Sequence, residues 1–276
     1  MFPSFANTAV ESLALGIALP VLVPSILAVV FVRLWPKRQG FLLAGLAFLG
    51  YGLIYPSDAN GQQPWQAHQI FPWALAVGLI TAWIPPAFGK KWLVRTCLLI
   101  VFVFAILAPV AVLRPPLTRV MLAAGVVLLG ILLWHSEDCL SDLESSFARW
   151  PSFSLAGLGL ASIFYSGIQI GQFMLLLGLF GLFVPYKDGG SSLVGAQSLL
   201  LARYGALLSM GVYTPQPTFW LPVILLIQLM PAGLVRYSRL TGQTVDQWRG
   251  PLAGAVLAAT LAIVGHALYE FTDAGY

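Results

Sequence analysis

One arginine of this sequence, Arg203, lies in the middle of an apolar run, SLLLARYGALLSM. A guanidinium at the centre of a bilayer costs about 2.5–3.5 kcal/mol on insertion scales, so it should face the interior of a helix bundle and find acceptors there. Its rigid fork of donors suits an anionic group of a substrate or lipid. The alternative, which is favoured, is a structural arginine that bonds carbonyls and amides or pairs with another subunit.

The acceptors expected for Arg203 are neutral, because no carboxylate lies at its depth. Glu11 and Glu270 fall at the outer ends of apolar runs, and the other acidic residues fall in loops, tails or boundaries. The remaining acceptors are hydroxyls such as Tyr165 and Ser166 and the amides that we take as candidate substrate-binding residues, Gln197, Gln169, Gln172 and Gln228. Cation-coupled pumping commonly relies on intramembrane acids and is therefore disfavoured.

Neither a catalytic residue nor a metal site or cofactor is predicted. Of the three histidines, His68 and His266 could meet at one membrane face, but two histidines alone make a weak metal site, and His135 lies at the other face. Cys97 and Cys139 have no ligand or disulfide spacing. Nucleophile-elbow, Walker, Rossmann and zincin motifs are missing from the sequence, so an enzyme is disfavoured.

Composition places these residues in a membrane protein. The chain has 276 residues, of which 59% are hydrophobic and 9% charged, whereas about a quarter of the residues of a soluble domain are charged. Apolar runs recur at the length that a helix needs to cross about 30 Å of hydrocarbon. The basic residues lie mostly in short loops, which indicates membrane orientation and not nucleic-acid binding. We expect an all-α polytopic transmembrane bundle whose partner is the lipid bilayer.

About ten spans joined by short loops are predicted. Eight apolar runs are clear: 9–34, 41–55, 70–88, 92–113, 119–135, 193–213, 218–237 and 251–270. The segment 153–186 is ambiguous, since one helix of 34 residues would be about 51 Å long. Two short helices place eleven Lys and Arg residues on the cytoplasmic side and two outside, whereas one helix gives seven and six. The positive-inside rule therefore favours the hairpin.

The turn of this hairpin is expected near SGIQIGQ, residues 166–172. A turn below the membrane surface must be buried in protein or line a cavity, which would make 153–186 a short re-entrant-like element. An ordinary tight turn at the interface is the favoured alternative. Small faces for close helix packing are supplied by Gly157, Gly159, Gly178 and Gly181.

A single integral domain of residues 1–276 is predicted in the plasma (inner) membrane, with both termini outside. Halves of five spans, 1–136 and 150–276, would have opposite orientations, as in inverted-repeat transporters, although the halves are not similar in sequence. The joining segment, 137–149, has apolar residues at helical spacing among acids. It is expected to form a cytoplasmic amphipathic helix or a solvated loop.

These features predict a permease-like protein that binds or moves a small or amphipathic solute, an anionic one being suited to Arg203. The alternative is a non-catalytic integral subunit of a larger membrane complex, with other membrane subunits as partners. A lipid-modifying enzyme is the third alternative. A cavity that reaches Arg203 would favour solute handling, whereas a filled bundle would favour the subunit.

Overall fold

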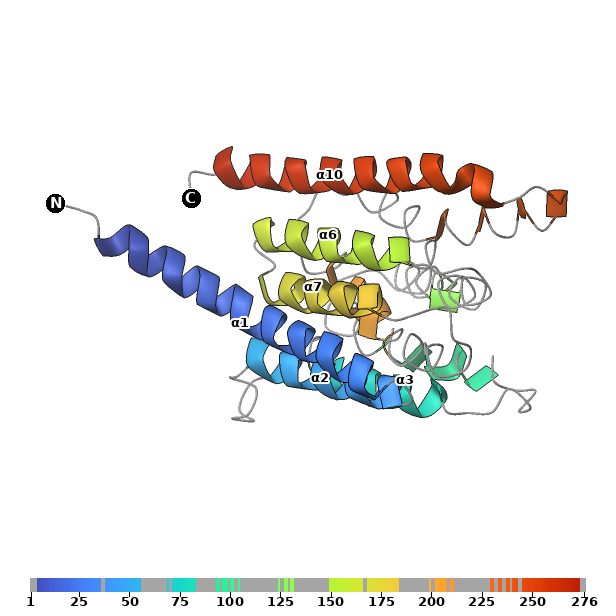
Figure 1. Cartoon of the computed structure of the whole chain (residues 1–276), viewed down its shortest axis with the longest axis horizontal. Helices are drawn as coiled ribbons and strands as arrows, with labels where there is room; N and C mark the ends of the chain where they lie inside the picture. The colour runs from blue at the N-terminus through green and yellow to red at the C-terminus, as the bar shows by residue number, and fades with distance from the viewer. Residues whose placement is uncertain are drawn as a thin grey trace.

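The structure is a computed structural model, and all its described elements are helices, which confirms the all-α class (Figure 1). Within the first helix, residues 4–34, burial is described for Gly16 and from Leu19 onward. The described residues are 4–35, 38–55, 69, 71–82, 93–94, 96–98, 100–101, 104, 124, 127–128, 130–131, 149–165, 168–183, 199, 202–207, 209–210, 229–230, 233–234, 237–238, 240–242 and 245–273.

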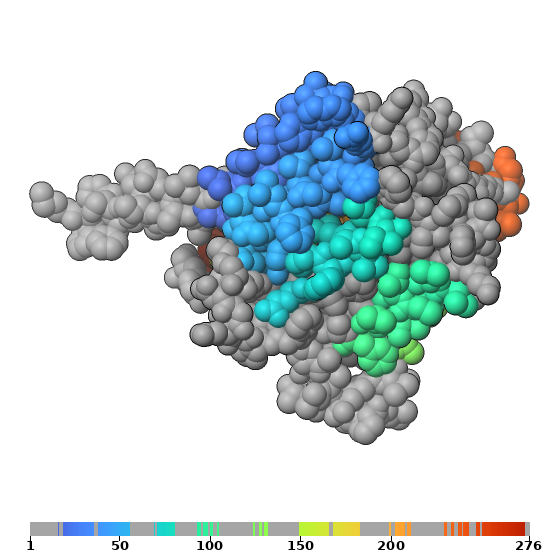
Figure 2. Space-filling view, turned by 90° about the horizontal axis from the view of Figure 1, so that it is seen from below, coloured from blue at the N-terminus to red at the C-terminus, as the bar shows by residue number. Residues whose placement is uncertain are grey.

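The bundle is arranged in layers around a central helical hairpin. Its elements are α1 (Ser4–Leu34), α2 (Gln39–Ile54), α3 (Phe71–Ala82), α6 (Trp150–Phe164), α7 (Ile168–Phe183), the 3₁₀ turn η5 (Val245–Trp248) and α10 (Arg249–Asp273). The α6–α7 hairpin lies between α10 on one side and α1 with α2 on the other. Figure 2 shows α1, α2 and α3 side by side on one face of the molecule.

The ambiguous segment 153–186 folds as two helices, which confirms the hairpin. Helix α6 has a proline in its first turn, where a missing N–H costs nothing, and it ends at Phe164, directly before Tyr165. With 15 and 16 residues, α6 and α7 are each about 22–24 Å long. The break between Phe164 and Ile168 falls at the start of the expected turn region, 166–172, and Gln169 and Gln172 lie in the first two turns of α7.

Glycines bring the backbones of α6 and α7 into direct contact. A Cβ atom on Gly178 would lie 2.5 Å from the backbone nitrogen of Ala156, and one on Gly159 would lie 2.5 Å from the backbone nitrogen of Leu175. A Cβ atom on Gly171 would lie 2.5 Å from the carbonyl oxygen of Gly159. These distances leave no room for a side chain, so the prediction of small packing faces is confirmed.

The side chains of α7 fill the centre of the bundle. Phe173 is fully buried and stacks on Phe71 of α3, with ring centroids 4.7 Å apart. Tyr51 of α2 meets the same Phe173 ring edge-on at 6.0 Å. Such aromatic pairs add about 0.5–1.5 kcal/mol each beyond area burial. Helix α7 therefore organises the packing of α2 and α3.

Helix α10 buries one stripe and leaves its other faces open. Leu252, Val256, Thr260, Ile263 and Ala267 are buried at helical spacing. Large apolar side chains stay exposed elsewhere on the helix: Leu257, Leu261, Leu268, Tyr269 and Phe271. In the most apolar window of this helix only 28% is buried, so α10 lies on the surface of the bundle.

Among the described residues, one helix, Gly250–Asp273, is long enough and apolar enough to cross a bilayer. The other apolar helical stretches with described side chains, including Leu19–Leu34 of α1, are 10–17 residues long. The structure thus does not show the ten predicted spans. Most of 92–113, 119–135, 193–213 and 218–237 lies outside the described residues, as does nearly all of the joining segment 137–149.

Candidate functional site

Arg203 is buried, with 5% of its surface exposed, which confirms that it faces the interior of the protein. It lies in a helical stretch, residues 202–207, beside the buried Tyr204. Tyr204 is hydrogen-bonded to the backbone of Gly130, so this stretch is tied to the helical residues around position 130. The candidate partners Gln197 and Gln228 lie outside the described residues.

Gln172 completes the hydrogen bonding of α1. Its Nε2 atom donates to the carbonyl oxygen of Gly16 over 2.7 Å, and 5% of the residue is exposed. In an α-helix this carbonyl would accept from the N–H four residues later. That residue is Pro20, which has no N–H to give. The amide of Gln172 therefore replaces a backbone donor that the sequence of α1 removes.

A second proline, Pro24, frees the carbonyl of Pro20 in the same way. This carbonyl faces α2, where a Cβ atom on Gly50 would lie 3.5 Å from its oxygen. Ser25 donates its hydroxyl hydrogen to the carbonyl of Val21 over 2.7 Å, a bond that often accompanies bending of a helix. The middle of α1 is thus shaped by contacts with α7 and α2.

Gln169 is exposed and contacts the end of α2. Its Nε2 atom lies 3.4 Å from the carbonyl oxygen of Ile54, a long and weak hydrogen bond. Ile54 is the last residue of α2, where carbonyls have no partner within the helix. Both described glutamines therefore donate to backbone carbonyls of neighbouring helices, and neither of these bonds involves Arg203.

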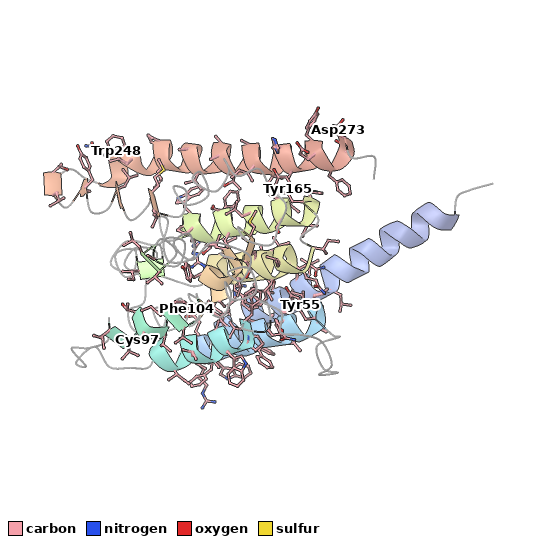
Figure 3. All side chains as sticks on the ribbon, turned by 180° about the vertical axis from the view of Figure 1, so that it is seen from behind. Tyr55, Cys97, Phe104, Tyr165, Trp248 and Asp273 are labelled. Atoms are coloured by element: carbon pink, nitrogen blue, oxygen red, sulfur yellow. The ribbon has the colours of Figure 1, made fainter. Side chains whose placement is uncertain are left out.

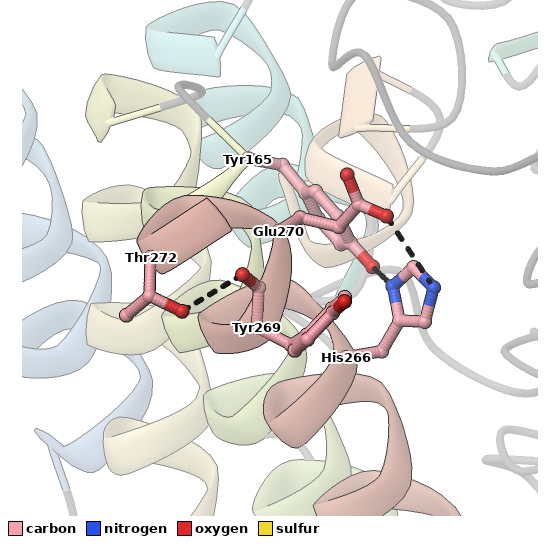
Figure 4. Close-up of polar contacts among 5 residues, drawn as sticks. All are labelled: Tyr165, His266, Tyr269, Glu270 and Thr272. Atoms are coloured by element: carbon pink, nitrogen blue, oxygen red, sulfur yellow. Dashed lines mark hydrogen bonds and ion pairs between the residues drawn. The ribbon is translucent and has the colours of Figure 1, made fainter. Parts of the chain in front are cut away.

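Three polar side chains meet where α6 ends against α10 (Figure 4). The hydroxyl of Tyr165 lies 2.7 Å from Nδ1 of His266. Nε2 of His266 lies 3.8 Å from Oε1 of Glu270, one helical turn further along α10. The exposed fraction rises from 5% for Tyr165 to 29% and 55% for the side chains of His266 and Glu270. The cluster thus leads from the surface into the bundle.

This cluster lies at one end of the molecule. Figure 3 places Tyr55, Tyr165 and Asp273 toward the same end, with Trp248 and Cys97 toward the opposite one. Helix α2 ends at this level, since Gln169 at the start of α7 reaches the carbonyl of Ile54. The end of the bundle therefore gathers the turn of the hairpin and its polar side chains.

Sequence reasoning missed this cluster. His266 was expected at one membrane face and Glu270 at the outer end of an apolar run, and their spacing of four residues places both on one face of α10. That spacing was a usable signal. Tyr165 carried no signal for this contact, because 101 residues separate it from His266.

The cluster suits proton exchange. Its members are a phenol, an imidazole and a carboxylate, which all donate or accept protons. The part of the chain that the structure describes holds no group of three or more His, Cys, Asp or Glu side chains arranged to bind a metal ion.

No protein-family model matches this chain, and no curated protein or solved structure is significantly similar to it.

Proposed function

We propose that this chain is a multi-pass protein of the plasma (inner) membrane that binds or moves a small or amphipathic solute, in the manner of a permease. The observation that carries the proposal is the α6–α7 hairpin. Its two helices are each about 22–24 Å long, shorter than the ~30 Å hydrocarbon core, and they are enclosed by α10, α1 and α2. Discontinuous or shortened helices enclosed in this way commonly form the binding sites of transporters.

The outer surface supports a lipid environment. Large apolar side chains point outward from three helices: Leu22, Ile26 and Val30 on α1, Phe41, Phe48 and Leu49 on α2, and Leu257, Leu261 and Leu268 on α10. Soluble monomers rarely expose extended apolar patches, and lipid covers such faces without cost. We further propose that the chain crosses the membrane ten times, with both termini outside.

Arg203 is the residue to which we assign an anionic group of the solute. Its burial gives its donors the low-dielectric setting in which charge-assisted hydrogen bonds are strong. Gln197 and Gln228 remain candidate partners. Gln169 and Gln172 contribute by fixing α7 against α2 and α1.

The test is flux through proteoliposomes that are loaded with a panel of small organic anions. The wild-type protein should release at least one anion faster than protein-free vesicles. Arg203→Gln should lose this flux while its elution volume and unfolding temperature stay unchanged. Absence of flux for every anion, or unfolding of the variant as its only effect, contradicts the proposal.

A second candidate, a non-catalytic subunit of a membrane complex, is favoured by the filled interior of the described bundle. Phe173, Phe180, Leu155, Leu158 and Met174 are all fully buried there. This candidate predicts that the chain co-purifies from native membranes with a fixed set of partner chains. A monodisperse single chain in mild detergent, with no partner at constant ratio, would count against it.

A further inference from the structure

We propose that Tyr165, His266 and Glu270 form a proton-binding site, in which protonation of His266 reverses its hydrogen bond with Tyr165 and alters the turn between α6 and α7. The proposal rests on the geometry of three side chains. It holds whether or not the chain carries a solute.

The first step is the direction of the hydrogen bond in the neutral state. The Tyr165 oxygen and His266 Nδ1 are 2.7 Å apart, a full hydrogen bond. When Nδ1 carries no proton it can only accept, so the tyrosine hydroxyl donates. The ring proton is then on Nε2, the nitrogen that faces Glu270 at 3.8 Å. We assign this tautomer from the two contacts.

A proton added to His266 changes which atom donates in its hydrogen bond with Tyr165. Both ring nitrogens of a charged imidazole are donors, so the Tyr165 oxygen must become the acceptor and its own hydrogen must turn to another acceptor. The charged ring and the carboxylate of Glu270 are already within ion-pair distance. Histidine gains and loses its proton in the physiological pH range. An added proton therefore reverses the direction of the Tyr165–His266 hydrogen bond.

Among the residues that the structure describes, charged and titratable groups reach His266 from two elements. Helix α6 presents Tyr165 at its end, whereas its described cation, Arg149, lies at its opposite end. Helix α10 presents Glu270 one turn from His266. Asp273, seven residues from His266 on the same face of α10, lies about 10 Å further along the axis. Of these groups, Tyr165 and Glu270 contact the imidazole.

The third step links the reversed bond to the hairpin. Tyr165 is the residue directly after α6, and its backbone N–H still donates to the carbonyl of Ala161 over 3.0 Å. A change in the contact of its side chain therefore acts on the last turn of α6. Phe164 also contacts Phe271 of α10, with ring centroids 5.8 Å apart. The neighbouring side chains of Phe164 and Tyr165 therefore both contact α10.

The test uses the full-length protein in lipid nanodiscs. Hydrogen–deuterium exchange, corrected for the intrinsic effect of pH, is measured over residues 160–172 at about pH 5 and about pH 8, the range that histidine protonation covers. We expect a pH-dependent change in the wild type. His266→Gln should abolish it, and Glu270→Gln should weaken it. Asp273→Asn removes the same charge further along α10 and should leave it intact.

Tyr165→Phe keeps the imidazole and removes the hydroxyl. It should remain folded, and its histidine should still titrate by ¹⁵N NMR, but exchange in the turn should no longer depend on pH. Hydrogen exchange that still depends on pH in Tyr165→Phe overturns the proposal. A wild-type turn that does not respond to pH overturns it as well, and so does an equal response in wild type and His266→Gln.

Discussion

The helices α7 and α10 both pack on α6, but α7 makes close backbone contacts with it, whereas the described contacts of α10 with it run through side chains. Against α7, the glycines Gly159 and Gly178 leave backbone in contact with backbone. Against α10, a Cβ atom on Gly157 would meet the side chain of Thr260, and Tyr165 meets the ring of His266. Backbone atoms cannot turn aside, whereas side chains can change rotamer.

The same difference holds for the polar contacts of the two helices. Gln172 of α7 satisfies a backbone carbonyl of α1, a neutral bond between fixed partners. His266 of α10 contacts two side chains that can each gain or lose a proton. We conclude that α7 belongs to a rigid core and that α10 is the adjustable neighbour of that core.

The largest effect is expected from Gly178→Ala. The new Cβ would lie 2.5 Å from the backbone nitrogen of Ala156 and 2.8 Å from its Cα atom, so the two helices must separate. We expect a loss of about 3 kcal/mol in the free energy of unfolding in detergent, at the upper end for overpacking. Gly254→Ala, on an open face of α10 with nothing within 4 Å, is the control. Gly254→Ala should raise the free energy of unfolding by up to about 1 kcal/mol.

The next effect tests the bond between Gln172 and Gly16. Gln172→Leu should cost about 1.5 kcal/mol, the upper end for a net hydrogen bond, because it removes the part-buried donor of the Gly16 carbonyl. Pro20→Ala restores the N–H of residue 20, and Gln172→Leu should then cost little. This double-mutant cycle is measured by equilibrium unfolding in detergent. An equal cost of Gln172→Leu in both backgrounds would show that the proline is not the reason for this bond.

A smaller effect is expected where α6 faces α10. Gly157→Ala should cost about 1 kcal/mol, the lower end for overpacking. Thr260→Ser removes the methyl group that the new Cβ would meet and keeps the hydroxyl that donates to Val256. The double variant, Gly157→Ala with Thr260→Ser, should therefore regain the stability that Gly157→Ala loses, as measured by thermal unfolding. Failure of this rescue would mean that the α10 interface is as rigid as that of α7.

The smallest effect on stability is expected from Tyr165→Phe. An interhelical hydrogen bond in a membrane protein contributes on average about 0.6 kcal/mol, so the loss should be of that order. Tyr269→Phe, at an exposed position on α10, is the matched control and should change nothing measurable. A loss of several kcal/mol for Tyr165→Phe would place this contact in the rigid core.

Local features of the sequence could predict part of this arrangement. The length of 153–186 and the basic residues around it indicated two helices, and its glycines indicated close packing, as the structure confirms. The apolar run 251–270 matches the interior of α10, whose ends lie within three residues of that range. Isolation of Arg203 in an apolar run predicted its burial. Each of these features depends on residues near one another in the chain.

The contacts that give the residues their roles could not be predicted in this way. Pro20 marks a free carbonyl on Gly16, but the sequence does not say which donor reaches it, since Gln172 is 156 residues away from Gly16. Tyr165 and His266 are likewise far apart in the chain. Such pairs depend on the mutual position of whole helices. For this reason the sequence did not reveal that Gln169 and Gln172, two of the four glutamines assigned to a solute, donate to backbone carbonyls of neighbouring helices.

The bond between Gln172 and Gly16 also constrains biosynthesis. At about 5–20 residues per second, the ribosome adds Gly16 roughly 8 to 30 seconds before it adds Gln172, 156 residues later. Throughout that interval the first helix carries a carbonyl that its own backbone cannot satisfy. Until α7 is made, that carbonyl therefore depends on water or on another donor. The final packing of α1 therefore requires that α7 has been made.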